Sequence, residues 1–326
     1  MKPTNKRVLW VERTQVIGML LVVLHHCVPH GYDGPGWLLN LLNGIQYPAL
    51  VCFFLASGLF APRWRRDGYG AYMKKRALRL LTPWLCVNLL MLAPRYVAAL
   101  AMGVKAKITP LWLLMSFLDP HGQGVTPHLW FLPALMLMAA LAPLLDRALR
   151  ARTPRAITLA ALLILSALPV KLPTLMCLNE LRLYLAWYAI GYALSVTRGD
   201  APPLRGAAGL AAGLAGLIAF ALTLVFPGLT MATFMQMLGA AALLACAGRC
   251  ERDDALTAFF RGKTYCVYIL SMCAQNLIEV LGYAARWPWI ITSLLMLAAG
   301  LAVPLLVCAW HEKRPLPRWL RLVVGL

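Results

Sequence analysis

The chain is poor in charged residues, and in acidic residues above all. Only 13% of its 326 residues are Asp, Glu, Lys or Arg, and 12 acidic residues stand against 31 Lys and Arg. Hydrophobic residues make up 61%, and the mean hydropathy is +0.71. This composition excludes an ordinary soluble globular domain. We therefore expect a membrane protein that crosses the bilayer several times.

Several sequence motifs are also missing. We find no Walker motif, no glycine-rich dinucleotide fingerprint and no convincing internal repeat, which argues against an ATP-driven pump in this one chain. The nine cysteines show no metal-type spacing, so we predict no metal site and interpret them as small apolar side chains. The first apolar run lacks a small-residue cleavage site and is followed by further runs. We therefore expect it to serve as its own insertion signal.

Ten apolar runs approach the ~20 residues that a helix needs to cross a bilayer. They cover residues 15–31, 44–61, 78–98, 128–145, 156–170, 183–196, 207–227, 229–248, 264–283 and 288–310. The fifth and sixth are short and interrupted by polar residues. The prediction is an all-α, polytopic transmembrane helical bundle of about ten spans, forming a single domain over residues 1–326.

The basic residues are distributed unevenly between the predicted loops. With a cytoplasmic N-terminus, 25 of the 31 cations fall on the cytoplasmic side. The six others are Arg95, Lys105, Lys107, Lys171, Arg182 and Arg286. Because cytoplasmic loops are enriched in Lys and Arg, this split predicts both termini inside and an even number of spans. The net charge of +19 then reflects topology, and we expect no nucleic-acid partner.

Two adjacent histidines, His25 and His26, lie within an uncharged run, residues 16–28. A rise of about 1.5 Å per residue from Val16 places His26 roughly 15 Å deep, halfway through a ~30 Å hydrocarbon core. Ionisable groups are costly there, so the pair is a functional-site hypothesis. The helical period gathers one stripe of residues: Glu12, Gln15, Met19, Val22 and His26. His25 is turned by about 100° and Arg13 lies nearly opposite, which favours His26. The alternative, strongest for His25, is a hydrogen bond to a neighbouring helix.

A basic segment precedes the third span. Arg76 and Arg79 are three residues apart and project from one face where that helix enters the membrane. Guanidinium groups bind phosphate oxygens bidentately, so the pair is suited to hold a phosphate. The alternative is a topogenic cluster that touches lipid headgroups.

A Pro- and Gly-containing segment, residues 119–131, precedes the fourth span on the predicted extracytoplasmic side. It supplies Asp119, His128 and Trp130 as candidate walls of an acceptor pocket; for Trp130 and Phe131 an interfacial aromatic belt is the alternative. In the ninth span Glu279 requires a partner, such as Gln275 one turn away, or a cavity. His30 and His121 have no evident partner, and the tyrosines that open the ninth span are candidate interface anchors.

Four blocks in order resemble the membrane-bound acyltransferase-3 family, which includes bacterial polysaccharide O-acetylases. The blocks are Trp10-Val11-Glu12 leading to Leu21-Val22-Val23-Leu24-His25-His26, then Phe53-Phe54-Leu55-Ala56-Ser57-Gly58, Lys75-Arg76-Ala77-Leu78-Arg79 with Pro83, and His128-Leu129-Trp130-Phe131-Leu132. Residues 188–192 and 265–270 are similar to later family segments. The resemblance implies an O-acyltransferase of the bacterial inner membrane. It would move an acyl group, typically acetyl, from cytoplasmic acyl-CoA to a hydroxyl of a carbohydrate, a lipid-linked glycan or another extracytoplasmic acceptor.

The same resemblance implies roles for individual residues. The family pattern has a first-helix acid, an arginine three residues on and a catalytic histidine eleven further. Glu12 and His26 match, whereas Gln15 replaces the arginine and Ser271 stands where a histidine is frequent. His26 would be the general base, or a nucleophile that carries the acyl group. The remaining assignments are Arg76, Arg79, Lys75 and Gln15 for the donor, Glu12 beside the catalytic group or along the donor path, and His128, Trp130, Asp119 and Glu279 for the acceptor.

The resemblance implies acyl-CoA as co-substrate, with no permanently bound cofactor and no metal, and membrane lipids as surroundings; the oligomeric state is not predicted. Two other classes stay open. A transporter or exporter of a small metabolite or glycan would use the same buried polar groups as a path, although it would normally show repeated halves with broken helices. A catalytically inactive, binding-only family member is the other, because Gln15 departs from the pattern.

Overall fold

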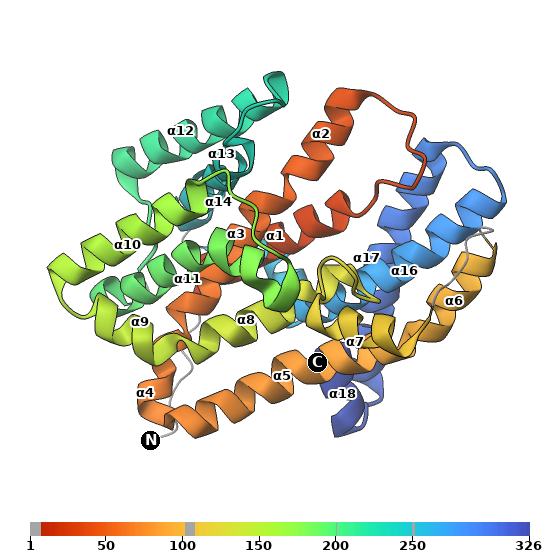
Figure 1. Cartoon of the computed structure of the whole chain (residues 1–326), viewed down its shortest axis with the longest axis horizontal. Helices are drawn as coiled ribbons and strands as arrows, with labels where there is room; N and C mark the ends of the chain where they lie inside the picture. Colours follow the sequence, from red (N-terminus) through yellow and green to blue (C-terminus); the bar gives the residue numbers. More distant parts are fainter. Residues whose placement is uncertain (1–7, 102–107, 200, 250–251) are drawn as a thin grey trace.

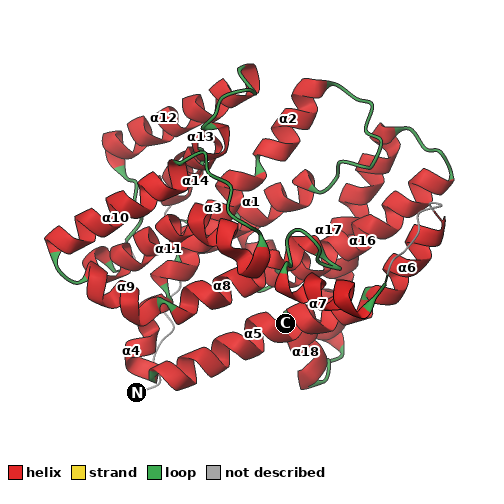
Figure 2. Ribbon diagram, viewed as in Figure 1, coloured by secondary structure: helices red, strands yellow, loops and turns green. Residues whose placement is uncertain are grey.

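The computed structural model of the chain describes residues 8–101, 108–199, 201–249 and 252–326. Predictions that involve Lys2, Lys6, Arg7, Lys105 and Lys107 lie outside these residues. Helices make up 79% of the chain, and the described residues contain no strand (Figure 2). The all-helical prediction is confirmed.

The helices follow one another along the chain as labelled in Figure 1. Their bounds are α1 Leu9–His25, α2 Gly36–Gly44, α3 Gln46–Leu59, η1 Ala61–Arg63, α4 Trp64–Asp67, α5 Tyr69–Leu90, α6 Leu92–Ala101, α7 Pro110–Leu118, η2 Pro127–Trp130, α8 Phe131–Ala140, α9 Ala142–Leu149, α10 Arg152–Ala167, η3 Leu175–Cys177, α11 Leu178–Arg198, α12 Gly206–Val225, α13 Ala232–Leu238, α14 Ala240–Arg249, α15 Ala255–Phe260, α16 Thr264–Ala284, α17 Trp289–Lys313 and α18 Arg318–Val324.

Six helical stretches of the described chain are long and apolar enough to cross a membrane. They are Gly36–Asp67, Tyr69–Val97, Gly206–Val225, Ala232–Arg249, Thr264–Ala284 and Trp289–Lys313. A seventh is obtained if Pro127–Ala140 and Ala142–Leu149, which meet at 54°, form one bent span. Helices α1 and α10 are shorter, with 17 and 16 residues. The structure therefore supports a polytopic membrane protein, while ten spans and two cytoplasmic termini stay predictions.

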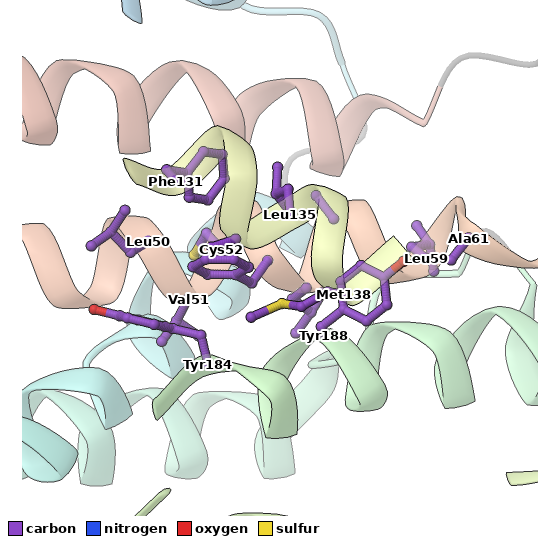
Figure 3. Close-up of a cluster of buried hydrophobic side chains, with 14 of the residues drawn as sticks. Leu50, Val51, Cys52, Leu59, Ala61, Phe131, Leu135, Met138, Tyr184 and Tyr188 are labelled. Carbon is purple, nitrogen blue, oxygen red and sulfur yellow. The ribbon is translucent and has the colours of Figure 1, made fainter. Parts of the chain in front are cut away.

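Helix α3 lies at the centre of the bundle, with α1 on one side and α11 on another. Its buried side chains interlock with those of α8 and α11; Figure 3 shows Leu50 and Cys52 of α3 beside Phe131 and Met138 of α8 and Tyr184 of α11. This core holds α8, and with it the segment that carries His128, in place.

Two glycines allow α3 and α11 to pack with their backbones in contact. A Cβ at Gly58 would collide with the carbonyl oxygen of Tyr188, and one at Gly191 would collide with that of Leu55. Small residues at helix crossings permit such an approach in membrane proteins. The crossing fixes how α11 lies against the core.

The bounds of helix α1 differ from those of the first predicted span, residues 15–31. It begins at Leu9 and ends at His25, and His26 is its C-cap. The helix ends before Pro29 because a proline disfavours the helical conformation of the residue before it. The two histidines thus lie at the end of a helix rather than halfway along one.

Arg13, near the start of α1, is bound by residues far away in the sequence. Arg13 is buried, and its guanidinium donates to a carboxylate oxygen of Asp254 at 2.8 Å and to the carbonyl oxygens of Ala247 and Arg252 at 2.9 and 2.7 Å. These bonds explain how an apolar helix accepts a charge. They tie α1 to the segment between α14 and α15.

Two further span predictions need correction. The helix of the third predicted span, residues 78–98, begins earlier, at Tyr69, so Arg76 and Arg79 lie within α5. The fourth, residues 128–145, bends between α8 and α9. Pro143 explains the bend, because its ring clashes with the carbonyl four residues before it. The short helices α2, α7 and α18 were not predicted; α18 packs against α5, and the C-terminus lies there (Figure 1).

Candidate functional site

A cavity of about 450 Å³ opens between α3, α5, α8 and α16. Four basic residues line it: Arg63, Lys75, Arg76 and Arg79. Of these, Arg63, Lys75 and Arg79 are exposed, whereas Phe131 and Tyr268, which also line it, are buried. The cavity therefore has a basic, exposed end and an aromatic, buried end. None of its lining residues is an acid.

Two arginines at the basic end rest on aromatic rings. The guanidinium carbon of Arg76 lies 5.3 Å from the ring centre of Tyr72, and that of Arg79 lies 5.4 Å from the ring centre of Tyr265. Stacking of this kind orients a guanidinium without consuming its N–H donors. In the part of the chain that the structure describes, neither arginine forms an ion pair with a carboxylate. Both retain donors for an anionic ligand.

Lys75 differs from these two arginines. Its ammonium donates to Asp67 at 3.0 Å, and Arg66 donates to the other carboxylate oxygen at 3.0 Å. Lys75 still borders the cavity, but its charge is partly compensated there. The two arginines carry most of the site's attraction for an anion.

The α1 side of the cavity is neutral. Gln15 lines it, at the position where the family resemblance implies an arginine. Glu12 does not line it; its carboxylate accepts from Arg261 at 3.0 Å, and Arg261 also binds Asp253. The structure thus brings Gln15 to the predicted donor residues and separates Glu12 from them.

The two adjacent histidines have different surroundings. The Nδ1 of His25 lies 3.0 Å from the carbonyl oxygen of Leu42 in α2, which is the helix contact kept as an alternative for this residue. The ring centre of His26 lies 6.1 Å from that of His128, edge to face. No hydrogen bond links the His26 ring to another described residue. His26 and His128 therefore form a pair contributed by α1 and η2.

Tyr268 connects this histidine pair with the cavity. Its hydroxyl donates to the carbonyl oxygen of His128 at 2.6 Å, and the two ring centres are 6.2 Å apart. The ring of Tyr268 also packs 5.7 Å from Phe131. His26 and His128 are not among the lining residues. Tyr268 is a lining residue that contacts His128.

His128 is buried, with its Nε2 3.5 Å from the carbonyl oxygen of Ile269. Its Nδ1 is buried and has no hydrogen-bond partner among the described residues. A buried polar atom without a partner is costly. His128 is thus the acceptor-side candidate that the structure places closest to His26.

The other predicted acceptor residues lie elsewhere. Trp130 is buried, stacks on His121 with ring centres 5.1 Å apart and packs against Tyr184. The carboxylate of Asp119 accepts from the Gly122 amide at 2.9 Å and closes a turn. Neither borders the cavity. Because Trp130 and Phe131 are buried in protein, they do not form an interfacial aromatic belt, while the acceptor role of Trp130 and Asp119 stays a prediction.

Glu279 has a different partner from the one predicted. It accepts a hydrogen bond from the backbone amide of His30 at 2.7 Å, and the His30 ring lies 2.5 Å from the same oxygen. Gln275 instead donates to the carbonyl oxygen of Val23 at 2.9 Å. Glu279 therefore ties the loop after α1 to α16 and lies away from the cavity.

Sequence reasoning missed three tyrosines and one ion pair. Tyr72, Tyr265 and Tyr268 line the cavity; the three-residue spacing of the last two was a usable signal, although they were interpreted as interface anchors. His121 pairs with buried Glu180 at 2.5 Å. No spacing in the sequence predicts the contact between His121 and Glu180. The described residues contain no group of three or more metal-ligating side chains.

Comparison with known proteins gives one result. The model of a protein family described as an acyltransferase domain, acyltransferase-3, matches residues 8–311. No curated protein and no solved structure matches the chain. The matched residues include α1, the residues that line the cavity, and His26 and His128.

Proposed function

The chain belongs to the acyltransferase-3 family, and on that premise we propose that it transfers an acyl group from acyl-CoA to a hydroxyl of an extracytoplasmic carbohydrate or glycan. Family membership implies acyltransferase activity in general. The donor, the acceptor class and the residue roles given below are our proposal.

One observation carries the proposal. A single cavity extends from Arg76 and Arg79 at its exposed end to Tyr268 at its buried end. Tyr268 in turn contacts His128, whose ring faces that of His26. Acyl-CoA has a matching polarity, with phosphates at one end and an uncharged thioester at the other. Charged phosphates suit the arginine end, and the thioester arm suits the apolar interior.

The chemistry follows from the position of His26. As general base, its imidazole takes the proton of the acceptor hydroxyl while the oxygen attacks the thioester carbon. The C–S bond then breaks, CoA leaves as a thiolate, and the imidazolium returns the proton to it. The thioester reaches His26 only if the side chains of Phe131 and Tyr268 move aside. His128, whose Nδ1 has no described partner, is suited to bind the acceptor.

An acyl-histidine intermediate is distinguishable from direct transfer. Incubation of the purified protein with acetyl-CoA alone, followed by digestion and mass spectrometry, would show an acyl group on the peptide that carries His26 if the histidine were the nucleophile. General-base catalysis leaves that peptide unmodified whether or not an acceptor is present, because the acyl group passes directly to the acceptor hydroxyl.

The orientation in the membrane is part of the proposal, because the donor must meet the arginine end from the cytoplasm. Reporter fusions near Arg66, Arg152, Arg252 and Arg318 should signal inside, and fusions near Lys171 outside. An outside signal at Arg252 would contradict the proposed topology of a bacterial inner-membrane protein.

The function is tested by complementation of a deletion strain. Surface and capsular glycans from strains with the wild-type protein, the His26→Ala variant or no protein are compared by mass spectrometry. We expect O-acyl groups only with the wild type. Equal acylation with wild type and His26→Ala would overturn the proposed role of His26, and glycans identical in all three strains would contradict a glycan acceptor.

A binding-only role has one observation in its favour, the neutral Gln15 at the cavity wall. Donor affinity without turnover would support it. A Gln15→Arg variant that gains turnover would then show that the departure at this position is the cause.

A further inference from the structure

A second cavity, of about 190 Å³, shares no lining residue with the first. It lies where α4, α9, α10 and α11 meet and is lined by three arginines, Arg65, Arg150 and Arg155, together with Asp146 and Tyr192. The apolar side chains of Leu149 and Val196 complete its wall. The volume is well above what one water molecule needs.

The one carboxylate in this cavity is already saturated. Asp146 is buried, and one of its oxygens accepts a hydrogen bond from Arg65. The same oxygen accepts a second one, of 2.8 Å, from the Tyr192 hydroxyl. The other oxygen accepts from Nε and Nη2 of Arg150 at 3.2 and 2.9 Å. Asp146 therefore cancels one of the three positive charges and has little capacity to bind a further donor.

Arg155 is left without a carboxylate. Its guanidinium is half-buried on the cavity wall, and no ion pair or side-chain hydrogen bond joins it to another described residue. It also lies in the first turn of α10, which begins at Arg152. The amide ends of a helix carry partial positive charge, so a cation there is unfavourable unless an anion is nearby.

We propose that this cavity binds a phosphate group, held by Arg155 together with the unused donors of Arg65 and Arg150. A guanidinium has five N–H donors, and Asp146 takes one from Arg65 and two from Arg150. The remaining donors and a local net charge of about +2 suit the tetrahedral oxygens of a phosphate. The group is the phosphodiester of an anionic lipid headgroup or a free phosphate ion, and this inference does not depend on the acyl-transfer proposal.

The test uses the full-length protein purified in a neutral detergent. Binding is measured from the thermal unfolding midpoint during titration with short-chain phosphatidylglycerol, with inorganic phosphate, and with short-chain phosphatidylcholine and chloride as references at constant ionic strength. The variant is Arg155→Gln. The matched control is Arg152→Gln, which removes an exposed charge one turn away on the same helix.

We expect saturable stabilisation by at least one of the two phosphate probes and a loss of affinity of about tenfold or more in Arg155→Gln, because a hydrogen bond to a charged group is lost. Arg152→Gln should bind as the wild type does. Saturation with phosphatidylglycerol but not phosphate identifies a lipid site, and saturation with phosphate identifies an ion site. Equal loss in both variants, or no stabilisation beyond phosphatidylcholine and chloride, would overturn the proposal.

Discussion

Arg65 and Arg76 belong to the same basic stretch of the sequence but have different partners in the structure. Arg65 is bound to buried Asp146, whereas Arg76 lies over Tyr72 in the wall of the large cavity and has no carboxylate partner in the described chain. The histidines divide in the same way: His30 and His121 pair with carboxylates, and His26 and His128 do not. A carboxylate partner thus marks side chains that tie elements of the fold together and keep only their remaining donors for a ligand, whereas Arg76 and His26 are not engaged in this way.

The largest effect is expected at His26, an unpaired group. His26→Ala should lower kcat for acyl transfer by about 10² to 10⁴, because a general base typically contributes that much. His25→Ala should be milder, since the Nδ1 of His25 lies against the Leu42 carbonyl oxygen and its ring, 4.6 Å from that of His26, contributes packing. His121→Ala should affect stability more than rate. Turnover is measured as CoA release in detergent. A larger loss in His25→Ala than in His26→Ala would break the comparison for the histidines.

The paired class is tested at Asp146. Asp146→Ala removes four hydrogen bonds from a buried carboxylate and leaves the Tyr192 hydroxyl without its acceptor. We expect the free energy of unfolding to fall by about 2 to 4 kcal/mol, with donor affinity unchanged. Asp67→Ala, at a pair whose cations are exposed, should cost much less, because water screens exposed ion pairs. Unfolding in mixed detergent micelles measures both, and equal costs would show that burial of the pair is irrelevant.

The unpaired arginines are tested by charge-conserving substitutions. Arg76→Lys and Arg79→Lys keep the positive-inside signal but lose the bidentate geometry, so donor affinity should fall about 10- to 150-fold. The control is Arg66→Lys, from the same basic stretch but outside the cavity. The measurement is the affinity for acetyl-CoA, or its KM, in the wild type, the two variants and the control. If the control loses as much as the two variants, or neither variant loses affinity, the arginines are only topogenic.

The smallest effect is expected at Asp254, outside the membrane spans. Hydrogen bonds from the Thr257 amide and from Arg13 lower the pKa of this carboxyl from 3.8 to about 2. Its contribution is therefore full above pH 4 and is lost as the pH falls through about 2. Asp254→Asn should cost about 1 kcal/mol at pH 7, a figure already reduced because solvent screens this partly exposed pair. The cost should be smaller near pH 3, because that pH lies below the ordinary pKa of 3.8 and part of the contribution is then lost. A cost that stays constant between the two pH values would contradict the assignment.

The sequence predicted the local features well. Apolar runs located most of the long helices, and the three-residue spacing of Arg76 and Arg79 put both side chains on one face, where the structure has them. The helical period also distinguished His26 from His25, whose ring lies against the Leu42 carbonyl oxygen, although the roles of both stay predictions. These features depend on neighbours within two turns of a helix, which is the range that sequence periodicity reports.

Long-range contacts escaped prediction for a physical reason. The partner of Glu279 is a loop residue, His30, that reaches it only because the chain turns after α1. Tyr268 gains its role from contact with His128, contributed by another element. Likewise nothing in a basic loop distinguishes Arg65 from Arg76, because the distinction depends on where Asp146 lies. Periodicity within one helix contains no information on such contacts.

The bonds of α1 also determine when the protein can finish folding during its synthesis. The carboxylate that pairs with Arg13 is 241 residues further along the chain, and the partners of Glu12 and His30 come still later. At a translation rate of about 5 to 20 residues per second, roughly 12 to 50 s pass before Asp254 is made. Helix α1 therefore leaves the ribosome long before the residues that hold it in place. Until then its arginine requires water, headgroups or the insertion machinery as a temporary partner.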